Sequence, residues 1–451
     1  MSFFGINLAS RSLQAHERML EVTGQNIANA NTPGYSRQVA ILRSVSGPGA
    51  QDGDHSGAPL AAGGGVEVAQ VMRSHAAWLD RVAASLEAQI GRTGVDARTS
   101  TQVEALLSEP GDAGLQATLD RFFDAFAGLA SHPDDAAARD AVLRAGNATA
   151  TRFQELTDGL DGLRGDMATA ARENVAVINQ LAQQVGDLNR VIGLAQSSGA
   201  APNELLDQRD QLLGELTRRA GVTVSGQTGS DLIVSLGGMT LVQGEQVDAL
   251  DIAPGTAANV ILRGTGGAVT PGGELAAQQQ WIDTALPDYR ARIAAVRDGL
   301  AAAVNTLHQS GTDRIGAPGQ AFFVSDGSGN LAVNPALVAD RQRLVAGDGT
   351  AADGSVALAI AHLGSAPGSV LPGYHALVAA VGAQVRDSRQ SAEQAQASRD
   401  QIRNLQASES GVNLDEELAQ MVELQHSYAA SARLLSAYDE MLSTLIQSTG
   451  G

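Results

Sequence analysis

Apolar side chains recur at a strict spacing of seven near the start of the chain. These positions are Ile6, Leu13, Leu20 and Ile27, and the positions three places after each hold Ala9, His16, Thr23 and Ala30. Two rows spaced by three and four residues lie on one face of a helix. The pattern therefore predicts one helix from about Phe3 to Ala30 that carries a narrow apolar seam.

The end of the chain repeats this pattern. Apolar residues stand at Leu414, Met421, Tyr428, Leu435 and Leu442, with Leu424, Tyr438 and Leu445 three places behind. Glu417 and Ser431 occupy the same second row, and we interpret them as interruptions. A single amphipathic helix often packs on its own domain core, whereas a seam sustained over about four heptads requires a partner helix. Two such seams at opposite ends of one chain favour pairing of the ends with each other.

Turn-forming residues follow the first predicted helix directly. Residues 26–38 read NIANANTPGYSRQ, in which the turn motif consists of Asn29, Asn31, Pro33, Gly34 and Tyr35. Asparagine and glycine tolerate the left-handed backbone conformation, and proline cannot continue a helix. The motif predicts a helix end and a corner at which the chain changes direction.

The patterns along the chain predict a mainly α fold with a small inserted β domain, in which long terminal coiled-coil helices flank a helical body. Residues 46–65 are rich in Gly and Pro and indicate an extended or mobile loop, and Gly221 marks a helix end. The predicted domains are residues 1–36 (N-terminal assembly helix and turn), 37–221 (extended loop, then the first part of the helical body), 222–272 (small β insertion), 273–409 (second part of the body, irregular over 310–372) and 410–451 (C-terminal assembly helix). We expect the body to fold without the β insertion, because helices flank it on both sides.

Charge and composition exclude several classes of function. The formal net charge is -19 and aromatic residues make up 3%, so the chain would repel phosphate backbones and lacks stacking platforms for bases. We therefore expect no nucleic-acid partner. All basic residues are arginine, which excludes a Walker A loop and lysine Schiff-base chemistry, and the absence of cysteine excludes thiol catalysis.

Candidate catalytic and metal-binding groups are equally sparse. None of the eight histidines stands at metal-ligand spacing from another, and we expect each at the surface or at a boundary. Adjacent acidic residues such as Glu416 and Glu417 are more typical of helix starts than of acid–base pairs. We predict no catalytic, cofactor or metal site and no enzyme activity. No stretch has the apolar length of a membrane span, and the first residues lack a signal-peptide pattern, so we expect a cytoplasmic protein or one exported without a cleaved signal.

The two ends of the chain resemble a known family. Residues 26–38 are similar to the N-terminal motif of the rod, hook and hook-associated axial proteins of the bacterial flagellum, and residues 410–446 are similar to their C-terminal motif. Within that group, TPGYSRQ, ELLDQRDQLLGELTRRAGVTV and VNPALVA most resemble the first hook-associated proteins, the hook–filament junction proteins of the FlgK family.

This resemblance implies a structural subunit at the junction between hook and filament. It implies extracellular location after type III export, assembly with copies of itself, and contacts with the hook protein and the second junction protein (the third hook-associated protein). It also implies an export chaperone at the C-terminal region, an inner tube built from the terminal helices, and a β insertion that faces outward. The seam rows Ile6 to Ile27 and Leu414 to Leu442 would form the assembly interface, with each terminus largely disordered until neighbouring subunits are present. The alternatives are another axial protein of hook or rod, or a secreted adhesin-like binding protein.

Overall fold

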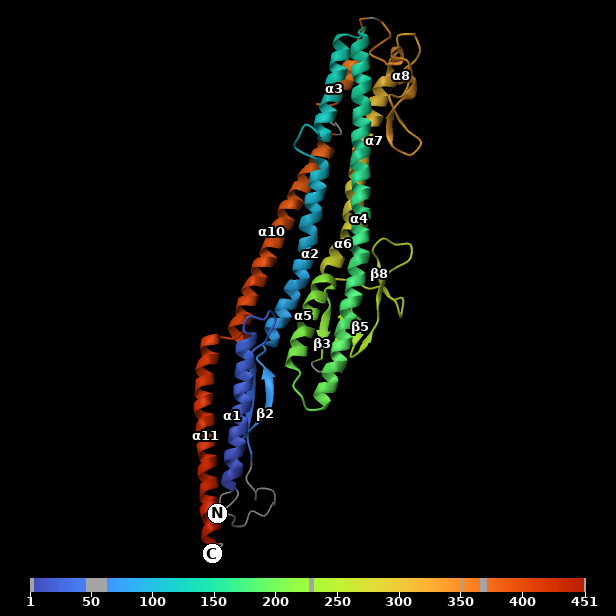
Figure 1. Cartoon of the computed structure of the whole chain (residues 1–451). Helices are drawn as coiled ribbons and strands as arrows, with labels where there is room; N and C mark the ends of the chain where they lie inside the picture. Colours follow the sequence, from blue (N-terminus) through green and yellow to red (C-terminus); the bar gives the residue numbers. More distant parts are fainter. Residues whose placement is uncertain (1–3, 46–62, 227–230, 351, 366–370, 450–451) are drawn as a thin grey trace.

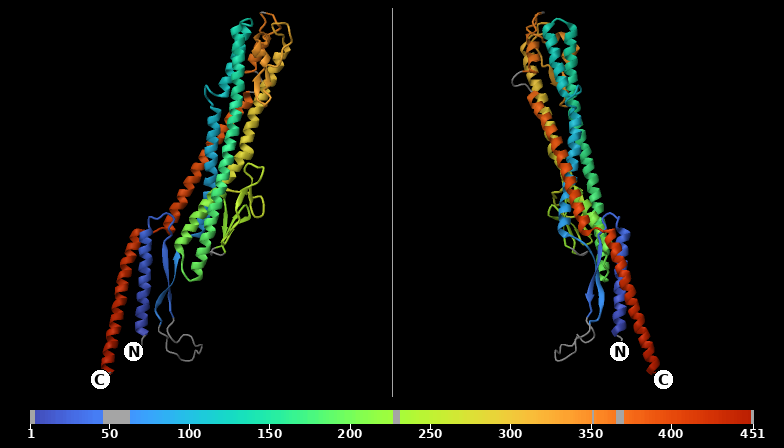
Figure 2. Two further views of the ribbon diagram at one scale, coloured as in Figure 1. Left: turned by 45° about the vertical axis from the view of Figure 1, so that its right-hand side comes forward. Right: turned by 90° about the vertical axis from the view of Figure 1, so that its left-hand side faces the viewer.

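The protein is elongated, and its two chain termini lie at the same end of the molecule (Figure 1). The computed structural model describes residues 4–45, 63–226, 231–350, 352–365 and 371–449. A pair of terminal helices forms one end, and a long bundle of helices forms the rest. The two views in Figure 2 agree that a small β unit lies on one flank of this bundle.

Helices make up most of the described chain. In chain order they are α1 (Phe4–Asn29), α2 (Ala77–Leu107), α3 (Leu115–Ser131), α4 (Ala136–Ser197), α5 (Asn203–Ala220), α6 (Gly273–Gln280), the π-helical turn η1 (Trp281–Ala285), α7 (Leu286–Ser310), α8 (Pro335–Ala339), the 3-10 turn η2 (Arg341–Arg343), α9 (Ser355–His362), α10 (Leu371–Ser410) and α11 (Leu414–Thr449). The mainly α fold with long terminal helices is confirmed. Gly221 ends α5 in the left-handed conformation, with φ +67°, as its sequence predicted.

The strands form small antiparallel sheets. They are β1 (Gln38–Ser44), β2 (Val66–Arg73), β3 (Thr223–Ser225), β4 (Ile233–Leu236), β5 (Met239–Gln243), β6 (Gln246–Val247), β7 (Leu250–Ile252), β8 (Val260–Leu262), β9 (Phe323–Ser325) and β10 (Leu331–Val333). Strands β3 to β6 form one sheet in sequential order, and β7 pairs with β8. These six strands are the predicted small β unit.

The β1–β2 hairpin was not predicted from the sequence. Its strands pair from Gln38 opposite Arg73 to Ser44 opposite Val66, with an irregularity after Ile41. The predicted loop over residues 46–65 lies almost entirely outside the described residues, which resume at residue 63. The stretch 310–372 is also more regular than predicted, since it contains the β9–β10 hairpin and the short helices α8 and α9.

Two apolar cores hold the body together. The first lies among α2, α3, α7, α9, α10 and the first half of α4, and the rings of Phe122, Phe126 and Phe322 meet in it edge to face. The second lies where α4, α5 and α6 meet the β unit. Among the described residues, neither core includes any residue of α1 or α11.

The β unit faces outward but belongs to the body. Its buried residues Val234 and Leu250 share the second core with Ile178 of α4 and Leu216 of α5. Leu250 also exchanges two backbone hydrogen bonds with the side chain of Asn179 on α4, at 2.7 and 2.9 Å. This shared core argues against the expectation that the helical body folds without the insertion.

His308 is fully buried beside Phe322 of the first core rather than at a boundary, so the expectation for this histidine was wrong. Its imidazole is fully buried, donates from Nδ1 to the Gln320 carbonyl and accepts at Nε2 from the Val345 N–H. Burial lowers the pKa of His308 to about 4. The ring is therefore neutral, and its two hydrogen bonds connect α7 to two neighbouring loops.

Candidate functional site

The terminal helices α1 and α11 lie side by side and run in opposite directions (Figures 1 and 2). We call them the terminal pair. Their packing in one chain agrees with the pairing of the ends that the sequence predicted. Their apolar core is thin, because the buried apolar residues of the two helices are Ala9, Ala15, Val22 and Leu424 among the residues described.

Contacts between the two helices of the terminal pair come partly from small and polar residues. Gly5 packs against the ring of Tyr438, and a Cβ placed on Gly5 would lie 2.6 Å from the ring carbon Cζ. The hydroxyl oxygens of Ser12 and Ser431 are 3.1 Å apart. Gly5 and Ser12 each stand one place before a predicted seam residue, so the row that meets α11 is not the row of large apolar residues.

The residues of the first, large apolar row of each predicted seam lie beside this contact line. Those on α1 are all half-buried, namely Ile6, Leu13, Leu20 and Ile27. Those on α11 are half-buried at Met421, Tyr428, Leu435 and Leu442, whereas Leu414 is exposed. A single chain thus leaves part of each large apolar row uncovered.

Two residues that the sequence analysis took for interruptions are among the most buried of α11. Glu417 is 1% exposed and Ser431 is 6% exposed. The Glu417 carboxylate accepts from Arg37 Nε at 2.6 Å and from Asn26 Nδ2 at 3.1 Å. The position of a charged residue inside an apolar row could have revealed this role from the sequence. Such residues often specify how two helices pair rather than interrupt the pairing.

Asn26, the first residue of the quoted motif, is the centre of this polar cluster. Its side chain makes four hydrogen bonds, which is the full capacity of a primary amide. Besides Glu417, its partners are the backbone N–H and carbonyl of Gln38, each at 2.9 Å, and the Tyr35 hydroxyl at 2.9 Å. The amide therefore joins the end of α1 to the first residue of β1.

The turn motif forms the predicted corner between α1 and β1. Thr32 donates its hydroxyl proton to Asn29 Oδ1 and its N–H to the Asn29 carbonyl, and Tyr35 N–H donates to the Thr32 carbonyl. Gly34 has φ +79°, which favours glycine. Asn31 is exposed, and Pro33 offers its carbonyl to Gln211 of α5 at 2.7 Å. Burial raises the pKa of Tyr35 to about 12, so this hydroxyl keeps its proton and donates it to Asn26.

Helix α5 ties the corner to the body. Asp207 accepts from Ser36 N–H at 3.1 Å and from Arg73 Nη1 at 2.7 Å, and Asp210 accepts from the same arginine atom at 2.8 Å. Burial by itself lowers the pKa of Arg73, but these two carboxylates outweigh that effect and raise it. Asn203 adds hydrogen bonds to Gln38 and to the Val71 carbonyl. The terminal pair is thus attached to the body through buried, charge-assisted contacts.

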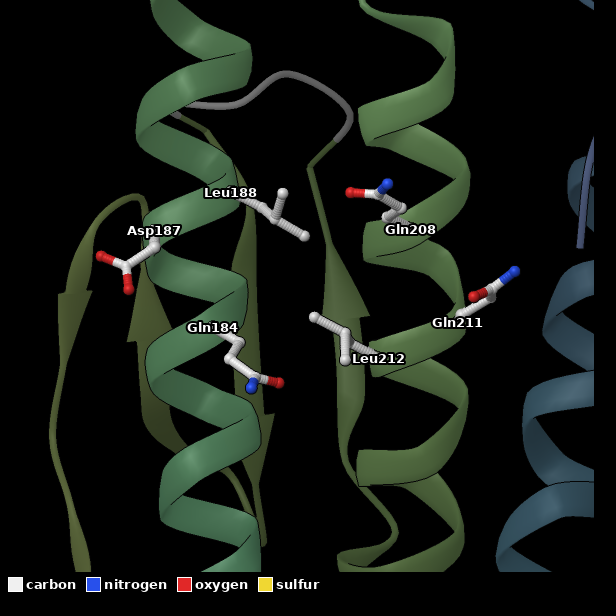
Figure 3. Close-up of a pocket in the computed structure, with 6 residues that line it drawn as sticks. All are labelled: Gln184, Asp187, Leu188, Gln208, Gln211 and Leu212. Carbon is white, nitrogen blue, oxygen red and sulfur yellow. The ribbon is translucent and has the colours of Figure 1, made fainter.

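A groove of about 410 Å³ runs between α4 and α5. Figure 3 shows the six residues that line it, namely Gln184, Asp187, Leu188, Gln208, Gln211 and Leu212. Three amides, two leucines and the single carboxylate of Asp187 offer no activated nucleophile and no acid–base pair. Among the described residues, no group of three or more acidic or histidine side chains could hold a metal ion. No helix in the described part of the chain is long and apolar enough to cross a membrane.

Comparisons with known proteins match both ends and the middle of the chain. Residues 6–35 match a family model described as flagella basal body rod protein, and residues 407–448 match one described as flagellar basal body rod FlgEFG protein C-terminal. Residues 100–323 match the flagellar hook-associated protein FlgK helical domain. The two end matches coincide with the two helices of the terminal pair.

Several curated relatives carry one name, flagellar hook-associated protein 1. The relative from Bacillus subtilis is 25% identical over 100% of this chain and 99% of its own length. The Escherichia coli relative is 30% identical over 70% of this chain, and the Salmonella typhimurium relative is 32% identical over 56%. These two matches span 59% and 45% of the relatives' own lengths.

A solved structure titled as the flagellar hook junction protein FlgK from Burkholderia pseudomallei is also similar. It has a TM-score of 0.49 and 24% identity, and the match covers 54% of this chain and 46% of that one.

Terminal helices that pair with each other and enclose an inserted body, matched at both ends by rod-protein models, define a flagellar axial protein. Within that class, the match to the FlgK helical domain and the match over the full length of a relative both indicate the same family. The chain belongs to the FlgK family of flagellar hook-associated proteins.

Proposed function

We propose that this chain is a non-enzymatic structural subunit that joins the hook of the bacterial flagellum to its filament. The observation that carries the proposal is the match of the whole chain to 99% of the length of a protein named flagellar hook-associated protein 1. The thin core of the terminal pair supports it further, because a pair that buries so little by itself gains stability from neighbouring subunits.

The assembly surface of this subunit consists of the incompletely covered apolar rows beside the contact line of the terminal pair. These rows comprise Ile6, Leu13, Leu20 and Ile27 on α1, and Leu414, Met421, Tyr428, Leu435 and Leu442 on α11. Their uncovered parts would pack against the terminal pairs of neighbouring copies. In an isolated subunit the pair opens readily, and incorporation into the ring closes it.

The partners and location follow from this role. The subunit contacts copies of itself, the hook protein and the third hook-associated protein, and an export chaperone binds its C-terminal region before secretion. It functions outside the cell as part of the flagellum, with no nucleic acid and no membrane insertion. The corner from Asn29 to Tyr35 directs the chain away from the inner helices toward the outer body.

Electron microscopy of flagella from a deletion strain tests this role directly. We expect complete hooks without filaments, with filament protein shed into the medium, and restoration by a plasmid-borne copy. Absence of hooks would instead indicate a rod or hook subunit. Normal filaments on the deletion strain would contradict an axial role and favour a secreted adhesin.

A further inference from the structure

Three contacts of the terminal pair fall on one row of each helix at matched spacing. From Gly5 to Ser12 is seven positions, as is the step back from Tyr438 to Ser431. From Ser12 to Asn26 is fourteen positions, as is the step back from Ser431 to Glu417. The same spacing places half-buried Met19 opposite buried Leu424, so one apolar layer separates the polar ones.

The apolar rows do not define this alignment by themselves. Because they repeat every seven residues, sliding α11 by one heptad would again bring apolar residues beside apolar residues. Some other feature must select the observed alignment over its two nearest slipped alternatives.

Each slipped alignment meets a specific penalty. One slip would move Glu417 from Asn26 to the position opposite Met19, and its buried carboxylate would lose Arg37 as well. The opposite slip would bring Tyr438 against Ser12 and Asn26 against Leu424. At Gly5 the tyrosine ring already fills the space of a Cβ, so the larger serine would clash and the Asn26 amide would lose its carboxylate partner. Buried polar groups left unsatisfied are costly, and charged ones most of all.

We propose that six residues act as specificity determinants that fix the register of the terminal pair. These register residues are Gly5, Ser12 and Asn26 on α1, and Tyr438, Ser431 and Glu417 on α11. Arg37 supports them by holding the Glu417 carboxylate, while its backbone N–H donates to the Ser410 carbonyl at 2.9 Å at the end of α10. The register decides how the large apolar rows of the two helices are offset on the outer surface. This inference concerns pairing within one chain and goes beyond the proposed function.

Disulfide cross-linking of the purified full chain tests the proposal, since the protein contains no cysteine. The pair Ser12→Cys with Ser431→Cys reports the observed register, because the two serine oxygens are 3.1 Å apart. The pair Ser12→Cys with Leu424→Cys reports a slip of one heptad, since these positions are offset by about 10 Å along the helix in the observed register. Each reporter is placed in the native background and in the background Asn26→Leu with Glu417→Leu.

In the native background we expect the in-register product and almost no slipped product. In the double-leucine background we expect slipped product to increase by about tenfold or more while helical content is retained, because the two leucines continue the apolar rows and no longer distinguish the two alignments. Glu417→Gln keeps the shape and a hydrogen bond to Asn26, so its slipped product should stay near the native level. Met421→Leu, an apolar exchange in the neighbouring row, is the matched control and should also stay in register.

Several outcomes would overturn the proposal. In-register product alone in the double-leucine background would mean that other residues set the register. Loss of both products together with a lower melting temperature would mean that the cluster serves stability and not alignment. Absence of the in-register product in the native background would mean that the pairing does not form within one chain. None of these outcomes bears on whether the subunit joins hook and filament.

Discussion

Asn26 illustrates how much of the corner depends on one side chain. Its four hydrogen bonds reach α11, the start of β1 and the tyrosine of the turn motif. Asn26→Ala would leave the Glu417 carboxylate and the Gln38 backbone short of partners, and each unsatisfied buried group costs about 1 to 3 kcal/mol. We expect limited proteolysis to cut within α1 at least roughly tenfold faster than in the parent.

The matched control for this variant is Asn31→Ala, which changes an exposed asparagine of the same motif. It should be cleaved at the parental rate, and α4 should stay resistant in all three proteins. Equal cleavage of α1 in Asn26→Ala and Asn31→Ala would show that the four hydrogen bonds do not secure the terminal pair.

His308 makes stability of the body depend on pH. Its pKa is about 4 in the folded protein and about 6.5 when unfolded, so the unfolded chain binds more protons between these values. The stabilisation is complete above pH about 6.5 and is lost as the pH falls toward 4, by up to about 3 kcal/mol. Denaturant titrations across this window should show a shallower slope for His308→Gln than for the parent. The exposed His426, changed to Gln, should leave the slope unaltered, and an unchanged slope for His308→Gln would refute the assignment.

At the scale of elements, local patterns predicted the long helices well and the pairing face poorly. Heptad spacing located α1 and α11 to within a few residues, because large apolar side chains repeat along them. It could not identify the row that meets α11, since Gly5, Ser12 and Asn26 carry no apolar signal. Their role becomes visible only when the opposing helix is in place, as it does for Glu417 and Ser431.

The β1–β2 hairpin was missed for a related reason. Val39, Ile41 and Met72 are exposed, so the strands show no burial on a regular alternate face. The strands are held instead by side chains of other elements, such as Asn26 of the preceding helix and Asn203 of α5 on Gln38. No pattern within the strands reports contacts supplied by other helices.

The β insertion provides a prediction at the same scale. Leu250 is fully buried in the second core and is hydrogen-bonded to Asn179 of α4, so Leu250→Ala should lower the free energy of unfolding by about 2 to 5 kcal/mol. It should also reduce amide protection in α4 around Ile178. Val224→Ala, at an exposed position of β3, should change stability by less than about 1 kcal/mol. Undiminished protection of α4 in Leu250→Ala would support an insertion that merely decorates the body.

At the scale of the whole molecule, stability is unevenly distributed along its length. The body has two cores, whereas the terminal pair at the other end has few buried apolar residues and is joined to the body through the corner and α5. This arrangement suits a subunit whose body folds alone and whose ends are completed by neighbours. The sequence predicted this division from the position of the two seams, although the row of large apolar residues in each seam lies beside the contact line.

The variant Leu20→Asp, as the only copy in the cell, tests the central claim most directly. Leu20 is half-buried beside the contact line, and burying a leucine against a neighbouring subunit contributes about 1.5 to 3 kcal/mol, whereas a buried carboxylate costs several more. The account predicts that this variant is exported but leaves hooks bare, with both it and filament protein in the medium. Gln14→Asp, on the exposed face of the same helix, should support normal filaments. Normal filaments on cells that carry Leu20→Asp would contradict the claim that this apolar row builds the junction.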